Sequence, residues 1–140
     1  MSDPELLQLA NDLRLACQVI GRRVRFEGTR SLAPHQASVL SHLRSGARTV
    51  GELACAERVS APSMTRTING LTEQGLVAKR QSPDDGRRVV VALTASGQEA
   101  VSRAIADRDC WMVRLLEGLD AESLERLRDL VPLLTEVAKS

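Results

Sequence analysis

Apolar residues recur every three or four positions over most of the chain, which is the spacing of one face of an α-helix. Two such stripes cover residues 4–26 and 34–43. Two more cover residues 94–118 and the C-terminal stretch that begins at Asp120. The pattern predicts a mainly α-helical protein, in which Pro132 kinks or divides the last helix because its ring clashes with the preceding turn.

Shorter elements are predicted between residues 49 and 94. The hydroxyl residues Thr49 and Ser60 suit helix N-caps, and each precedes a short amphipathic stretch that ends near residue 58 or at Gly75. Residues 76–80 and 88–93 are typical of strands, and the turn sequence SPDDG lies between them. We therefore expect two short helices joined by a turn, followed by a two-stranded hairpin.

The second of these short helices, residues 61–74, has two unlike faces. Met64, Ile68 and Leu71 form one apolar seam, since they fall at i, i+4 and i+7. The opposite face has short polar side chains and one arginine, Arg66, where a solvated helix usually has Glu and Lys. Such a face suits a helix that lies in the major groove of DNA, because its polar groups can reach base edges without obstruction.

Charge is unevenly distributed along the chain. The formal net charge is +1, but residues 58–88 contain six Lys or Arg against three acids, a local net of +3. On charge alone an ordinary solvated surface is the simpler interpretation, although a basic face on a near-neutral protein also suits a localised polyanion contact. One Trp, one Phe and no Tyr leave no aromatic platform for single-stranded bases, so the nucleic acid expected is a duplex.

The chain lacks the patterns of enzymes and metal sites. Cys17, Cys55 and Cys110 are far apart, and His35 and His42 lie seven positions apart, which does not suit one metal ion. No nucleophile–base set or phosphate-binding glycine loop is present, so we expect no catalytic residue, metal or cofactor. The N-terminus does not resemble a signal peptide, and no apolar run approaches the roughly 18 residues of a membrane span. We therefore expect a cytoplasmic protein.

A signature in the hairpin resembles a known family. Asp85-Gly86-Arg87, followed after five residues by Leu93-Thr94, matches the D-x-R-x5-L-T wing signature of the MarR family of bacterial winged-helix regulators. The sequence GELA at 51–54, together with residues 60–66 and 71–77, is similar to that family's helix-turn-helix. The resemblance covers nearly the whole chain. It implies a winged helix-turn-helix with a two-stranded wing at 33–94, an N-terminal dimerisation helix at 1–32 and C-terminal dimerisation helices at 95–140.

The resemblance also implies a function. It predicts a homodimeric transcriptional regulator, a repressor released by a small aromatic effector, that binds double-stranded DNA at a pseudo-palindromic operator. The recognition helix would enter the major groove and the wing arginine the minor groove, with Asp85 orienting the guanidinium of Arg87 through a bidentate pair. The expected DNA-binding residues are Ser60, Pro62, Ser63, Thr65, Arg66, Thr67, Asn69, Lys79, Arg80, Asp85, Arg87 and Arg88.

Two alternatives stay open. One is a winged-helix module that contacts protein and not DNA, although such a module does not require Arg66 and Asn69 beside an arginine-tipped hairpin. The other is a redox-sensing regulator. Some family members sense peroxide through a cysteine in the first helix supported by tyrosines, but this chain has Cys17 and no Tyr. We therefore expect Cys17 and Cys55 to be small core residues.

Overall fold

The computed structural model describes residues 1–28 and 31–140, and it confirms the mainly helical fold. The helices in the described part are α1 (Asp3–Glu27), α2 (Pro34–His42), α3 (Val50–Glu57), α4 (Ala61–Glu73), α5 (Ala95–Leu116) and α6 (Ala121–Lys139). A single 3-10 turn, η1 (Leu43–Ser45), follows α2, and the strands are β1 (Arg48–Thr49), β2 (Val77–Gln81) and β3 (Val89–Leu93). No helix in these two stretches is both long and apolar enough to cross a membrane.

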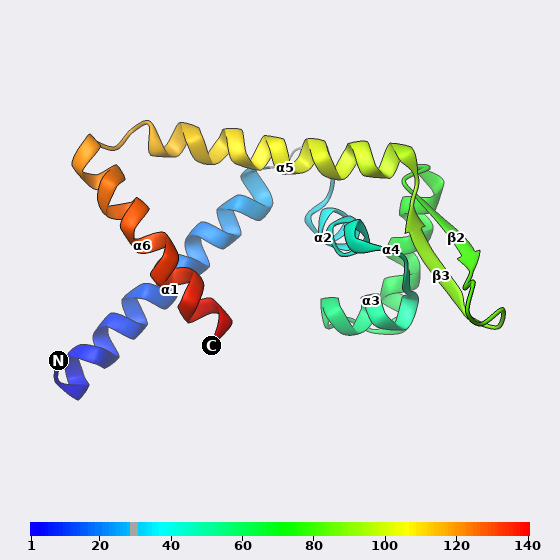
Figure 1. Ribbon diagram of the computed structural model, residues 1–140, viewed down its shortest axis with the longest axis horizontal. Coiled ribbons are helices and arrows are strands. Elements are labelled where there is room, and N and C mark those ends of the chain that lie inside the picture. The colour runs from blue at the N-terminus through cyan, green and yellow to red at the C-terminus, as the bar shows by residue number, and fades with distance from the viewer. Residues whose placement is uncertain (29–30) are drawn as a thin grey trace.

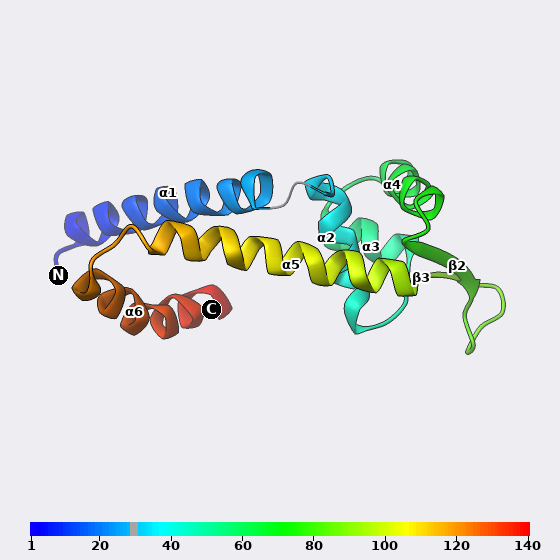
Figure 2. The same ribbon diagram turned by 90° about the horizontal axis from the view of Figure 1, so that it is seen from above.

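The molecule is elongated, and α5 joins its two ends (Figure 1). The elements α2, α3, α4 and the three strands gather around the N-terminal part of α5, and we call them the head. The helices α1 and α6, with the C-terminal part of α5, form the stem. Figure 2 shows α1 and α6 on opposite sides of α5, with both chain termini in the stem and away from the head.

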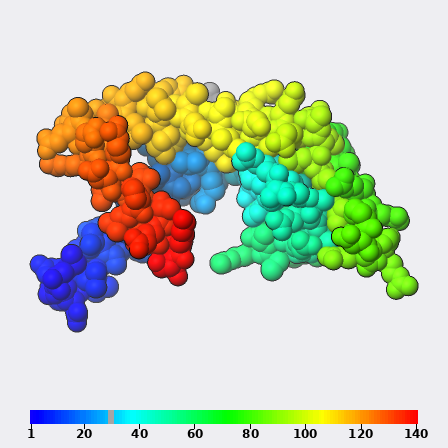
Figure 3. Space-filling model, in the orientation of Figure 1, coloured from blue at the N-terminus to red at the C-terminus, as the bar shows by residue number. Residues whose placement is uncertain are grey.

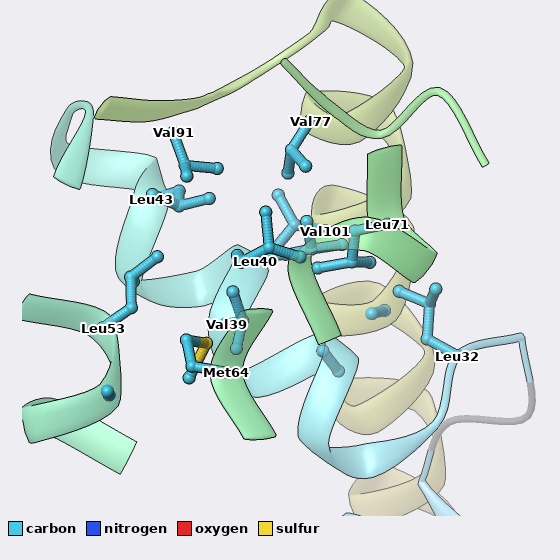
Figure 4. Close-up of a cluster of buried hydrophobic side chains, with 14 residues drawn as sticks. Leu32, Val39, Leu40, Leu43, Leu53, Met64, Leu71, Val77, Val91 and Val101 are labelled. Atoms are coloured by element: carbon cyan, nitrogen blue, oxygen red, sulfur yellow. The ribbon is translucent and has the colours of Figure 1, made fainter. Parts of the chain in front are cut away.

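The hydrophobic core lies in the head. Leu40 of α2, Ile68 and Leu71 of α4 and Val91 of β3 are fully buried, and Val101 of α5 is 1% exposed. Figure 4 shows Leu40, Leu71 and Val101 converging, so α5 closes the core over α2 and α4. The predicted apolar seam of α4 is therefore confirmed, and its burial leaves the opposite face of that helix free.

Hydroxyl caps fix where the head helices begin, as the sequence predicts. Thr49 Oγ1 accepts a hydrogen bond from the Glu52 amide at 3.1 Å, and Ser60 Oγ accepts one from the Ser63 amide at 3.2 Å. At the other end of α4, Gly75 has a φ of +73°, which favours glycine and turns the chain from α4 towards β2. These local signals fix where α3 begins and where α4 begins and ends.

The sheet has a third strand beside the predicted hairpin. The strand order is β1-β3-β2, and both pairings are antiparallel. In the hairpin, Val77 pairs with Leu93 and Gln81 with Val89, while Arg48 of β1 pairs with Val91. Strand β1 has only two residues, too few for a periodic signal, but it anchors the wing to the start of α3.

Two expectations outside the head core are corrected: Pro132 does not divide α6, and two cysteines expected in the core are exposed. Helix α6 runs through Pro132 without being divided, since the proline removes only one backbone donor and its acceptor, the Arg128 carbonyl, lies on an exposed helix open to water. Cys17 and Cys55, expected as small core residues, are exposed, as is Cys110. Cys17 lies on α1, which buries no residue in the protomer, and Cys55 lies on the outer face of α3.

Candidate nucleic-acid interface

The polar face of α4 is open to solvent. Thr65, Arg66 and Asn69 are exposed, whereas Met64 and Ile68 on the other face are buried. Ser60 and Pro62 at the start of the helix are also exposed, and Ser63 and Thr67 are half-buried. The exposed residues of α4 thus share an accessible surface, and Figure 1 shows this helix next to the hairpin.

One predicted reading residue is engaged by the wing. Lys79 Nζ on β2 donates a hydrogen bond to Asn69 Oδ1 at 3.0 Å. That contact uses the amide oxygen of Asn69 as an acceptor, so its NH2 group can still donate to another partner. The bond also ties the exposed side of α4 to the hairpin, so helix and wing present one continuous surface.

Backbone hydrogen bonds and one carboxylate hold the hairpin tip in place. The Ser82 amide donates to the Arg88 carbonyl at 2.8 Å, and the Arg88 amide donates to the Asp85 carbonyl at 3.0 Å. The Asp85 carboxylate accepts a hydrogen bond at 3.0 Å from the backbone amide of Arg87, and not from its guanidinium. The expected bidentate pair is therefore wrong for the free protein. Asp85 instead stabilises the turn through the backbone, and the turn, not an ion pair with Asp85, positions Arg87.

The cations of the interface divide into two groups. Arg66, Arg80 and Arg87 are exposed and form no ion pair within residues 1–28 and 31–140. Arg88, in contrast, pairs with Glu52 of α3 at 3.2 Å, and Arg48 of β1 approaches the same carboxylate at 3.9 Å. Sequence reasoning missed Glu52 and Arg48. The only available signal was the position of Glu52 three residues after the Thr49 cap.

A hollow of about 410 Å³ lies beside α4, against α2 and the end of α3. Its walls include His35, Val39, Met64 and Arg66, and Glu57 lies at one side. Glu57 accepts a hydrogen bond from Ser38 Oγ, and its Oε1 lies 2.8 Å from Nε2 of His42. His42 therefore joins α2 to α3. Within the described residues no group of His, Cys, Asp and Glu could hold a metal ion.

A second hollow of about 770 Å³ lies between the end of α1 and the middle of α5. It is lined by Phe26, Trp111 and Arg114, with Cys110 and two carboxylates at its edge. The guanidinium of Arg23 lies 5.4 Å from the ring centre of Trp111 and also donates to Glu27. That hydrogen bond lowers the pKa of the Glu27 carboxyl, so this acid stays charged beside the hollow.

Comparison with known proteins gives one family. The family model described as MarR family matches residues 31–88. An HTH-type transcriptional regulator of Mycobacterium leprae is 39% identical over 132 residues, which are 93% of this chain and 92% of the relative. An HTH-type transcriptional repressor of Bacillus subtilis is 25% identical over 139 residues, covering 95% of this chain and 90% of the relative.

Solved structures agree in fold. A transcriptional regulator of Pseudomonas aeruginosa matches 100% of this chain and 99% of its own, with a TM-score of 0.83 and 29% identity. The apo form of MarR from Escherichia coli has a TM-score of 0.70 at 22% identity, covers 96% of each chain and shows the same fold. The sequence matches extend well beyond the helix-turn-helix, into the stem helices. The chain therefore belongs to the MarR family, whose regulators bind DNA and function as dimers, and it is a transcriptional regulator and not an enzyme.

Proposed function

We propose that this regulator is a repressor that binds a pseudo-palindromic operator as a homodimer and releases it when a small aromatic effector binds. The observation that carries the proposal is the exposed polar face of α4 beside a wing whose Arg87 is free of any ion pair in the described part of the chain. The repressor named in Bacillus subtilis, similar over 95% of this chain, supports the direction of the regulation.

The head has distinct roles for its polar groups. Arg66 reads guanine in the major groove, because its guanidinium can donate two hydrogen bonds to one base edge. Arg87 at the wing tip enters the minor groove, where narrow A/T stretches attract arginine. The remaining predicted contacts position the protein on phosphates and neighbouring base edges. They come from Ser60, Pro62, Ser63, Thr65, Thr67, Asn69, Lys79, Arg80, Asp85 and Arg88.

The stem supports the homodimer. Helices α1 and α6 bury no residue in the protomer, yet they carry many large apolar side chains. These side chains are 38–73% exposed: Leu6, Leu7, Leu9, Leu15, Val19, Ile20, Leu127, Leu130, Val131, Leu133, Leu134 and Val137. An apolar surface of this extent requires a partner. Figure 3 shows that the protomer is hollowed beneath α5, between α6 and the head, which leaves room for a second copy.

A two-fold axis through the stem would place two recognition helices in successive major grooves. Half-sites of a two-fold dimer lie about 34 Å apart, one turn of DNA. A change in the stem would alter that separation without touching the reading surface. The hollow between α1 and α5 supports an effector there, because its volume lies within the range of ligand sites and it offers Phe26, Trp111 and Arg114 to an aromatic acid.

Duplex binding tests the proposal. The full-length protein is titrated with labelled duplex from the upstream region of its own gene, and with an unrelated duplex of equal length, over a range of salt concentrations. We expect tighter binding to the upstream duplex and a log–log salt slope of about −0.9 for each phosphate neutralised. Equal, weak retention of both duplexes would contradict the proposal and favour the winged-helix module that contacts protein.

A further inference from the structure

Glu52 lies between two arginines of the wing sheet. Its Oε1 is 3.2 Å from Nη2 of Arg88, which lies 36 positions later in the chain, just before β3. Its Oε2 is 3.9 Å from Nη1 of Arg48 on β1. Because β1 and β3 pair side by side, one carboxylate at the start of α3 faces two guanidinium groups at one edge of the sheet.

These contacts contribute little to the fold. The side chains of Arg48 and Glu52 are each 46% exposed and that of Arg88 is 57% exposed, and ion pairs in such positions contribute little to folding stability. The start of α3 is already held by the Thr49 cap, and β1 is held by its pairing with β3. Glu52 also accepts a hydrogen bond from Thr49 Oγ1 at 3.1 Å and lies in the first turn of α3, where an acid favours the helix dipole. Neither role requires the two arginines that face its carboxylate.

The contacts do change the charge that the head presents to DNA. Arg66, Arg80 and Arg87 are unpaired within the described residues, so they are available to a polyanion. Arg88 and Arg48 already face the carboxylate of Glu52, which offsets part of the positive charge that they present to a phosphate. Non-specific binding comes almost wholly from phosphate neutralisation, whereas the operator also gains from contacts to bases.

We propose that Glu52 is a specificity-determining residue, an internal counter-ion that withholds Arg48 and Arg88 from the phosphates of arbitrary DNA. Specificity is a difference between two affinities, so a group that weakens the wrong complex is as useful as one that strengthens the right one. In the operator complex the base contacts fix how the head docks. On arbitrary DNA the head can adopt whichever orientation neutralises most phosphates. Loss of the counter-ion should therefore raise the affinity for arbitrary DNA more than the affinity for the operator. The inference rests on the DNA binding proposed above.

The test compares Glu52→Gln with the wild-type protein on random duplex and on the upstream duplex. Gln keeps the size and polarity of the side chain, and a thermal melt confirms that the variant is folded. On random duplex we expect two- to fivefold tighter binding at low salt, about the worth of an exposed ion pair. The salt slope should become steeper by about 0.9 for each arginine released. On the upstream duplex the gain should be smaller, so the ratio of the two affinities falls.

Two controls separate release of the arginines from a general loss of negative charge. Glu73→Gln removes an exposed carboxylate at the end of α4 that has no ion-pair partner in the described stretches, and it should leave the slope unchanged. In an Arg48→Ala/Arg88→Ala background, Glu52→Gln should also have no effect on the slope.

Three outcomes overturn the inference while leaving the proposed function intact. They are an unchanged slope in Glu52→Gln, an equal change in Glu73→Gln, and an effect of Glu52→Gln that persists without the two arginines. A wild-type protein that retains neither duplex at any salt concentration would instead refute the proposed function, and with it this inference.

Discussion

Replacing Gly97 with alanine should destabilise the protein, although the residue lies in a helix where alanine is ordinarily favoured. Gly97 is in the first turn of α5, below the bend that leads from α4 into β2. A Cβ at this position would lie 1.9 Å from the carbonyl oxygen of Leu76 and 3.2 Å from Leu93 Cδ2. The Leu76 carbonyl oxygen also accepts a hydrogen bond from the Thr94 amide at 3.1 Å. Because the new Cβ forces this carbonyl to move, that hydrogen bond is strained.

The magnitude follows from two opposing effects. Overpacking costs about 1–3 kcal/mol, and a weakened hydrogen bond adds about 0.5–1.5 kcal/mol. The better helix propensity of alanine offsets about 1 kcal/mol of this. The net loss is therefore about 0.5–3.5 kcal/mol, which lowers the Tm by roughly 2–12 °C for a chain of this length.

The assay is thermal unfolding followed by circular dichroism, at one protein concentration because dimer stability depends on it. Gly51→Ala is a matched control, since Gly51 is also in the first turn of a helix and its added Cβ would meet only Thr49 Oγ1, at 3.9 Å. We expect Gly51→Ala to leave the Tm unchanged or raise it. A Gly97→Ala protein that melts at or above the wild-type temperature would refute the close approach of α5 to Leu76.

The remaining predictions concern DNA and the dimer. Arg66→Ala should lose about 1–3 kcal/mol of operator binding and relax the sequence preference at one base position. Fluorescence anisotropy on a set of single-base operator variants measures both effects. Uniform weakening across all variants would mean that Arg66 contacts phosphate and not a base. Arg87→Ala should weaken binding and remove protection of the flanking minor grooves in a hydroxyl-radical footprint, and wild-type protection would exclude the minor-groove role. Leu130→Asp should weaken the dimer by about 1–3 kcal/mol, because the 44% of the Leu130 side chain that is exposed in the protomer would lose its burial in both copies of a two-fold interface. Sedimentation measures this loss, and an unaffected dimer would place the interface elsewhere.

Local signals made most of the head predictable from the sequence. Thr49 and Ser60 cap α3 and α4 where their hydroxyls suggested, and the seam of α4 is buried as its spacing requires. The hairpin was predictable because turn residues separate two β-prone stretches, and its strands lie within one residue of the expected positions. Caps, seams and turns depend on neighbours within about four residues, which sequence patterns record.

Features that depend on distant residues were not predictable. The contacts of Lys79 with Asn69 and of Glu52 with Arg88 join residues 10 and 36 positions apart, and only the packed head brings them together. Strand β1 exists because β3 lies beside it. The exposure of Cys55 likewise follows from which side of α3 meets the core, and a helix of 8 residues with small side chains on several sides leaves that choice open.

Selection of bound duplexes from random sequence tests the central claim most directly. The full-length protein is mixed with a random duplex pool at moderate salt, and the retained DNA is amplified and sequenced over several rounds. From the proposed two-fold dimer we predict a pseudo-palindrome whose half-sites are centred about 10 base pairs apart, with A/T-rich flanks where the two wings would enter the minor groove. Recovery of unenriched sequence, or of an asymmetric single site, would contradict a two-fold dimer that reads DNA through α4 and Arg87.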